Sequence, residues 1–303
     1  MDGFVVQGAA ALLKGGASRI RPPATIFPNR KRRATVENFE APRRERRPCR
    51  SKGANDAPPG WEIALLEVTM MNDGARVGSL RFDADRVRRF TSVEPRVISI
   101  HHHFRPERKR VEAYIEATYA QVYDGKIRAH YPTLMSVQDA QGEIHAAVGF
   151  RLAGDEPLFL ERYLDEPIER ALAAALDTDI QRAHVAEIGN LASGSAGASL
   201  FLFMALARYL DQVGCEYAVA TATRQLRRTF GRVGFPTQRL TTADPTRLGD
   251  EARDWGGYYE RDPEVLAGAI APALEPLAHL LLVESPAIPG ARARLHPQLG
   301  ADQ

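Results

Sequence analysis

The chain is poor in cysteine. Only Cys49 and Cys215 occur among 303 residues, and they are too far apart in sequence to predict a disulfide framework or a paired-cysteine metal site. Such cysteine usage is typical of a reducing compartment, so we expect a cytoplasmic protein. The first residues, MDGFVVQGAA, carry an acid where a secretion signal carries positive charge, so no signal of that type is expected.

Long apolar runs are also missing. The best stretch, Val265 to Val283, is interrupted by two prolines, a glutamate and a histidine. A membrane-spanning helix needs about 20 consecutive, mostly apolar residues. We therefore expect no integral membrane association.

Neither sign of charge dominates, since 40 Lys/Arg residues nearly balance 38 Asp/Glu residues. The charges are unevenly placed, because residues 1–60 hold 13 basic and 5 acidic residues. We expect this segment to be a basic disordered tail. Its basic clusters lack interleaved aromatic residues, so a nucleic acid partner is not expected.

The pattern after residue 60 predicts an α/β protein. Two strands, 61–71 and 75–82, flank Asn72-Asp73-Gly74 and predict a β-hairpin, which we assign to an N-terminal extension of residues 61–95. Residues 96–284 then alternate between helical and strand patterns, which predicts a mixed central sheet flanked by helices. Residues 285–303 are assigned to a C-terminal tail. The expected elements are a strand at 96–100, a helix at 107–126, strands at 132–138 and 143–152, a short segment at 158–163, a helix from Asp165 to 176, a strand at 184–191, a helix to 210, a strand at 216–222, a helix between Thr223 and Gly234, and a return strand from Phe235.

The stretch 183–210 combines a strand, a turn of small residues and a largely apolar helix. The turn, Ser193 to Ala198, has no bulky side chain, so its main-chain N–H groups can approach an anion at the start of the helix. The natural ligand would be a phosphate, such as the pyrophosphate of coenzyme A or the phosphopantetheine of a carrier protein. Tight packing of the helix on the sheet is the alternative explanation for the small residues.

Several blocks resemble known families. VGFRL (148–152), PLFL (157–160) and VAEIGNLA (185–192) resemble the acyl-homoserine-lactone synthases, which have the acyl-CoA N-acyltransferase (GNAT) fold. The chain is more similar to the bacterial thermostable hemolysin family, over roughly residues 96–272. That pattern is carried by IRAHYPTL (127–134), FLERYLDEPI (159–168), EIGNLAS (187–193), TAT (221–223) and WGGYY (255–259).

Two departures concern the acyl carrier. Gly189-Asn190 stands where the lactone synthases have Ser-Arg, so a positive charge is missing. The loop has Gly194 and Gly197 but no leading Arg or Gln of the common GNAT phosphate motif.

The resemblance implies acyl transfer from a thioester to an amine, which requires a base for the amine proton. Glu187 is the first candidate, because an acid within an apolar strand is costly unless it has a partner, and burial would raise its pKa. Glu161 is the second candidate. For both, a structural ion pair with Arg151 or Arg162 is the alternative.

Other residues are candidates for binding. We expect Arg151, Arg162 and Asn190 to contact the substrate. Tyr258 or Tyr259 is a candidate to protonate the leaving thiolate or close the acceptor pocket, with core packing as the alternative. Main-chain donors near the end of the strand would hold the oxyanion, and the following turn would hold phosphate. This cofactor-binding set is Leu191, Ala192, Ser193, Gly194, Ser195, Ala196, Gly197 and Ala198.

No metal cofactor is expected. His101, His102 and His103 are consecutive, so on a strand only the first and third share a face. The sequence favours an N-acyltransferase that moves an acyl group from acyl-CoA or acyl carrier protein to a small amine or amino-acid derivative. A hemolysin that acts directly on membranes and a non-catalytic GNAT-like binding module are the alternatives.

Overall fold

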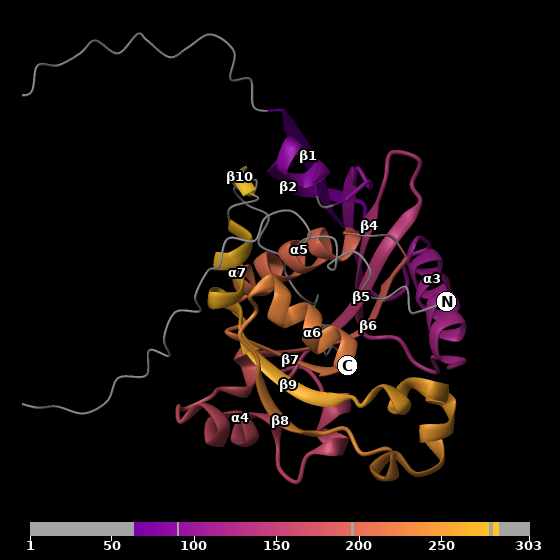
Figure 1. Ribbon diagram of the computed structural model, residues 1–303, viewed down its shortest axis with the longest axis vertical. Coiled ribbons are helices and arrows are strands. Elements are labelled where there is room, and N and C mark those ends of the chain that lie inside the picture. The colour runs from indigo at the N-terminus through magenta and orange to yellow at the C-terminus, as the bar shows by residue number, and fades with distance from the viewer. Residues whose placement is uncertain (1–63, 90, 195–196, 279–280, 285–303) are drawn as a thin grey trace, which may run out of the picture. The chain divides into compact units, whose positions relative to one another are not determined.

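A computed structural model describes residues 64–89, 91–194, 197–278 and 281–284 of the chain. The predicted tails, 1–60 and 285–303, lie outside these residues. In the described part, ten strands form one sheet in the order β10-β2-β1-β3-β4-β5-β6-β7-β9-β8 (Figure 1). The strands are β1 (Leu65–Asn72), β2 (Ala75–Asp83), β3 (Val97–His101), β4 (Thr133–Gln138), β5 (Ile144–Leu152), β6 (Val185–Ser193), β7 (Tyr217–Ala222), β8 (Gln238–Thr242), β9 (Glu264–Ala269) and β10 (Leu281–Glu284).

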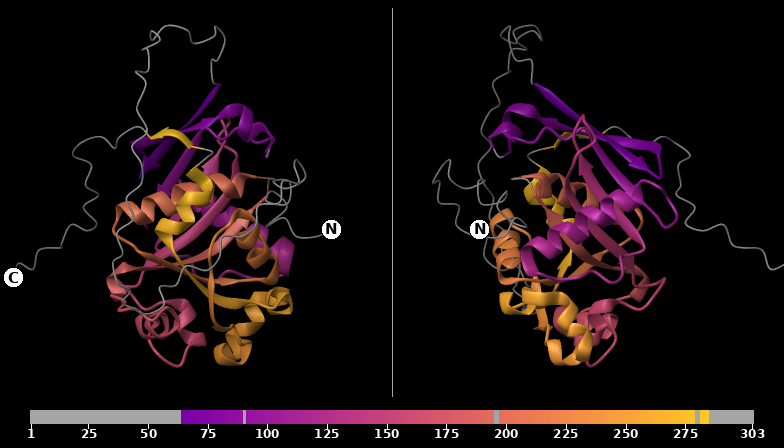
Figure 2. Two further views of the ribbon diagram at one scale, coloured as in Figure 1. Left: turned by 60° about the vertical axis from the view of Figure 1, so that its left-hand side comes forward. Right: turned by 90° about the vertical axis from the view of Figure 1, so that its right-hand side faces the viewer.

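Helices cover both faces of this sheet. Figures 1 and 2 show α3 on one face, and α5, α6 and α7 on the other. The predicted mixed sheet flanked by helices is therefore confirmed. The helical elements are α2 (Ala84–Arg88), α3 (Arg108–Tyr123), η2 (Phe159–Tyr163), α4 (Ile168–Leu176), η3 (Arg182–His184), α5 (Ala198–Gln212), α6 (Arg224–Val233), η4 (Pro245–Arg261) and α7 (Ile270–Ala278), of which those labelled η are 3-10 helices.

The predicted N-terminal hairpin is confirmed, and the structure shows where it belongs. Asp73 (φ 48°) and Gly74 (φ 85°) both have positive φ, as a tight two-residue hairpin turn requires. Strand β1 then pairs in parallel with β3. The hairpin therefore extends the same sheet that carries the rest of the fold.

The helix after the small-residue turn is buried on most sides, as predicted. Helix α5 contributes Phe201, Leu202 and Met204 to the core, each at most 1% exposed. Phe201 meets Phe82 of β2 edge to face, with ring centroids 5.0 Å apart. This helix thus joins the added hairpin to the central strands.

Strands β6 and β7 are parallel neighbours, but their pairing stops early. The ladder runs from Val185 opposite Tyr217 to Ile188 opposite Ala220. The strand predicted at 216–222 is therefore confirmed, and it pairs in parallel with β6. Beyond the pair of Ile188 and Ala220, β6 pairs only with β5, and β7 pairs only with β9. The sheet is consequently open between them at that end.

Two expectations need correction. The helix predicted from Asp165 begins at Ile168, because the Glu161 carboxylate accepts the N–H of Ile168, while Asp165 pairs with Arg247. The run 265–283 includes β9, α7 and β10, which the pattern did not indicate. Pro272 is accommodated in the first turn of α7, where a missing N–H leaves no helical hydrogen bond unmade.

The ring of Tyr131 packs directly on two glycines, Gly149 of β5 and Gly189 of β6. A Cβ at Gly149 would lie 2.7 Å from the Cβ of Tyr131, and one at Gly189 would lie 2.3 Å from its Oη. Neither glycine has a positive φ. The requirement for glycine here is therefore one of space for the Tyr131 ring.

We predict that Gly189→Ala lowers the free energy of unfolding by about 1–3 kcal/mol, because the added methyl group collides with a packed ring. Gly78→Ala is the matched control, since Gly78 also lies in a strand but has no atom within 4 Å of a built Cβ. Urea denaturation of both variants measures the difference. Equal stability of the two would contradict the close packing of Tyr131.

Candidate functional site

A cavity of about 150 Å³ occupies the opening between β6 and β7. It is lined from both faces of the sheet, by α5 and α6 on one side and by residues of α3, η2 and η4 on the other. Sites for drug-sized ligands usually measure about 300–1,000 Å³. The cavity here is smaller than that.

A β-bulge helps to form this opening. Gly189 pairs with Gly149 and Ala192 with Ala147, so Asn190 and Leu191 together oppose Val148 alone. Asn190 has φ 49°, a left-handed conformation that asparagine tolerates better than most residues. Both bulged residues line the cavity.

Asn190 presents an unsatisfied polar atom at the cavity. The residue is 5% exposed, and within the described residues its Oδ1 has no hydrogen-bond partner. A buried polar atom without a partner is costly. Its position on the cavity wall indicates an acceptor for a ligand N–H or O–H group.

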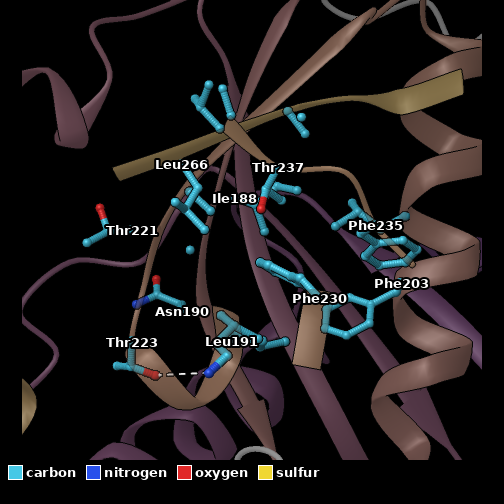
Figure 3. A pocket seen from close by; sticks show the side chains of 18 of the residues that line it. Ile188, Asn190, Leu191, Phe203, Thr221, Thr223, Phe230, Phe235, Thr237 and Leu266 are labelled. Atoms are coloured by element: carbon cyan, nitrogen blue, oxygen red, sulfur yellow. Dashed lines mark hydrogen bonds between the residues drawn. The ribbon is translucent and has the colours of Figure 1, made fainter. Parts of the chain in front are cut away.

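The cavity wall is otherwise mostly apolar. Figure 3 shows Phe203, Phe230 and Phe235 grouped on one side, and Asn190 and Thr223 on the opposite side. The three phenyl rings are mutual neighbours, with centroids 5.8–5.9 Å apart. The α3 side of the wall is also aromatic and consists of Tyr119, Tyr123, Tyr131, Phe159, Tyr163, Trp255 and Tyr258.

Glu187 is buried beside this wall but does not line the cavity. Its side chain is 2% exposed, and its two carboxylate oxygens accept the N–H groups of Phe159 at 2.8 Å and Leu160 at 2.9 Å. Arg151 Nε lies 3.3 Å from Oε2, and the neighbouring Tyr131 side chain also lowers the pKa of Glu187. Burial raises the pKa of Glu187, while Arg151 and the two main-chain donors oppose that rise.

Arg151 and Arg162 lie behind the aromatic wall. The Arg151 guanidinium is 4.5 Å from the ring centre of Tyr131, and that of Arg162 is 5.4 Å from the ring centre of Phe159. Arg162 also pairs with Glu251 at 2.5 Å. Neither arginine lines the cavity, so a role for them in substrate contact stays a prediction.

Glu161 lies in a network of its own. It accepts the N–H groups of Leu158 and Ile168, both at 2.9 Å, and forms two hydrogen bonds with the Arg182 guanidinium. The Arg182 hydrogen bonds are the main reason that the pKa of Glu161 falls to about 2. A carboxyl group with so low a pKa is a weak base near neutral pH. Its hydrogen bonds to Leu158 and Ile168 connect η2 to the start of α4.

Tyr258 and Tyr259 are held by different partners. Tyr258 lines the cavity, and its hydroxyl donates to the carbonyl of Thr221 at 2.9 Å. Tyr259 does not line the cavity, but its hydroxyl lies 2.6 Å from that of Tyr163, which does. Burial raises the pKa of both tyrosines.

The predicted phosphate turn is only partly described. Ser195 and Ala196 lie outside the described residues. Leu191 lines the cavity, whereas Ala192 and Ser193 continue β6. The Gly194 N–H donates to Tyr114 Oη at 2.7 Å. Gly197, at φ 85°, precedes Ala198, the first residue of α5, so phosphate binding by this turn stays a prediction.

Strand β3 ends at His101, so His102 and His103 lie beyond it and the strand alternation expected for the histidine run does not apply. His101 is buried with Nε2 3.4 Å from Ser136 Oγ, and His102 pairs with Asp73. Elsewhere, Asp139, Glu143 and His145 bring potential metal-ligand atoms within 4.8 Å of one another in the β4–β5 turn. Asp139 already accepts two main-chain N–H groups and His145 there, which accounts for the geometry as a turn.

Sequence reasoning missed most of the aromatic wall. Tyr131 and Tyr163 stood within the family blocks but carried no local signal of a role. The structure shows what such a signal would require: Gly149 and Gly189 pair on neighbouring strands and together leave room for the Tyr131 ring.

None of the described helices is long and apolar enough to span a membrane.

A family model described as thermostable hemolysin matches residues 101–274, more than half of the chain. No match is found among curated proteins.

Similar solved structures include the acyl-homoserine-lactone synthase LasI, which is 16% identical with a TM-score of 0.44. The match covers 62% of this chain and 97% of the LasI chain. TofI, solved with an inhibitor and MTA, is 18% identical with a TM-score of 0.42 over 60% of this chain and 96% of its own. FeeM, an N-acyl amino acid synthase from uncultured soil microbes, is 15% identical with a TM-score of 0.40 over 57% of this chain and 96% of its own.

We predict that Glu161→Gln lowers the free energy of unfolding at pH 7 by about 1.5–3 kcal/mol, the usual value of hydrogen bonds to a charged group. Folding lowers the pKa of Glu161 from 4.5 to about 2. The contribution of this carboxylate to the free energy of unfolding is therefore complete above pH 4.5 and is lost as the pH falls towards 2. Denaturant unfolding across this pH range should therefore show that the free energy of unfolding of the variant falls less steeply with decreasing pH than that of the wild type.

Glu251→Gln is the control, since Glu251 is an exposed partner of Arg162. An acid limb equally steep in the wild type and Glu161→Gln would contradict the structural assignment of this carboxylate.

Proposed function

This chain belongs to the thermostable hemolysin family, and we propose that it is an N-acyltransferase whose acyl thioester enters the cavity between β6 and β7. The donor would be acyl-CoA or an acyl carrier protein, and the acceptor a small amine or amino-acid derivative. The observation that carries the proposal is the apolar opening in the sheet with an unsatisfied amide oxygen on its wall.

The shape of the cavity supports a linear donor. Phosphopantetheine and its acyl chain are slender, and an apolar lining favours the chain by removing its methylene groups from water. The phenyl rings of Phe203, Phe230 and Phe235 would contact the chain. Asn190 Oδ1 would accept a hydrogen bond from an N–H of the pantetheine arm or of the acceptor amine.

The bulge supports the chemistry that follows. As the amine attacks the thioester, charge develops on the carbonyl oxygen and needs fixed donors nearby. Asn190 and Leu191 are displaced from regular pairing with β5 at the cavity wall. Their main chain is where we place the stabilisation of the oxyanion, in keeping with the sequence expectation for Leu191.

Filling the cavity should block the donor. Ala220 lines the cavity, belongs to the last β6–β7 pair and is half-buried. We predict that Ala220→Phe raises the Kd for decanoyl-CoA by roughly tenfold or more, because the benzyl group occupies the space of the chain. Ala174→Phe, on the exposed side of α4, is the matched control.

Native mass spectrometry with decanoyl-CoA and decanoyl carrier protein measures this binding, and liquid chromatography with mass detection of amides from an amino-acid panel measures transfer. Wild-type protein that binds neither donor would refute the acyltransferase. Lysis of liposomes by the purified protein alone, without any donor, would favour a direct action on membranes instead.

Asn190 allows a finer test. Asn190→Gly removes the amide but retains ready access to φ 49°, so we predict a small change in stability. Donor or acceptor binding should weaken by about 3- to 10-fold, the value of one net hydrogen bond. Thermal unfolding and binding titrations measure the two effects separately, and unchanged binding of both substrates would remove Asn190 from the site.

A further inference from the structure

Glu187 is separated from the cavity that it would have to serve as a base. Its oxygens are fixed by the N–H groups of Phe159 and Leu160, and it is absent from the lining. A proton leaving an amine in the cavity therefore needs an intermediate group to reach it. Proton transfer requires hydrogen-bond distance, directly or through one further group.

Tyr131 is placed to be that group. It lines the cavity beside Glu187, because the Arg151 guanidinium lies 4.5 Å from its ring centre while Arg151 Nε lies 3.3 Å from Glu187 Oε2. Burial raises the pKa of Tyr131, so it is a neutral phenol that can accept one proton while it donates another.

The position of Tyr131 is fixed from every side. Its ring lies over Gly149 and Gly189, with room for no Cβ at either residue. The Arg151 guanidinium stacks 4.5 Å from its ring centre, and its carbonyl accepts Arg108 Nη2 at 2.5 Å. A residue of this kind has little freedom, which favours a group that must hold one geometry during a reaction.

We propose that Tyr131 is a catalytic residue of the acyl transfer, relaying the proton of the acceptor amine to Glu187. This inference rests on the proposed function. The amine lone pair forms the new C–N bond, the N–H proton passes to Tyr131 Oη, and the phenolic proton of Tyr131 passes to the Glu187 carboxylate. When the C–S bond breaks, the proton returns through Tyr131 to the departing sulfur, so the products are an amide and a free thiol.

The relay requires an ionised Glu187, so turnover should rise with pH as that carboxyl loses its proton. Burial raises the pKa of Glu187, which places this limb above the ordinary carboxyl range. The charged and titratable groups that face the pair are Arg151 from β5, Tyr163 from η2 and Tyr119 from α3. Of these, Arg151 is the cation, and it lowers the pKa of Glu187.

Tyr131→Phe tests the relay, because it keeps the ring over the two glycines and deletes only the hydroxyl. With decanoyl-CoA and the amine that gives most amide with wild type, we expect unchanged donor binding and a fall in turnover of about 10²- to 10⁴-fold. The residual activity should lack the acid limb. Tyr209→Phe, a buried tyrosine of α5 that does not line the cavity, should keep wild-type turnover.

Glu187→Gln supplies the second measurement. It should also lose the acid limb, and the double variant should be no slower than the slower single variant, because the two groups act as a unit. If Tyr131→Phe fails to fold or to bind donor, the pH profile of Glu187→Gln decides, and a retained acid limb overturns the relay.

The two proposals fail in different ways. Wild-type turnover and an intact acid limb in Tyr131→Phe would overturn the relay and leave the acyltransferase standing. Absence of both donor binding and amide formation in the wild type would overturn the acyltransferase, and the relay with it.

Discussion

The buried carboxylate of Glu187 is the interaction on which the rest of the site depends. A charge at 2% exposure is tolerated only with partners on several sides. Its oxygens hold η2 through the N–H groups of Phe159 and Leu160, its charge faces Arg151, and Tyr131 is its further partner. One side chain of β6 thereby fixes a 3-10 helix, a neighbouring strand and an aromatic ring of the cavity wall.

The opening of the sheet is the second constraint, and it follows from the same strand. The pairing of β6 with β7 ends at Ile188, one residue after Glu187, and the bulge in its pairing with β5 begins at Asn190. The separation exposes apolar surface from both layers of helices to one cavity. Folding tolerates this gap because β5 and β9 continue to pair with the outer edges of the two strands. A parallel pair of strands that opens in this way leaves main-chain atoms without their usual partner strand.

Much of the fold could be predicted from local pattern. The Asn72-Asp73-Gly74 turn, the Thr223 cap of α6 and the Gly234 end of that helix each depend on residues within a few positions of one another. The elements that escaped prediction depend on distant partners. Helix α4 begins at Ile168 because Glu161 accepts its N–H, and β9 is a strand because β7 and β8 lie on either side of it. Such choices are made by contacts that no short window contains.

By itself, the sequence determined the class of the fold, the family, and the stretch around Glu187 as the centre of interest, because an acid in an apolar strand is a strong signal wherever it occurs. Only the tertiary structure decided what that acid can reach. It placed Asn190 on the cavity wall and Glu187 off it, because β6 leaves its pairing with β7 only after Ile188. It also brought Tyr131 from the start of another strand onto two glycines. The partner of a buried charge is set by packing in three dimensions, which sequence spacing does not record.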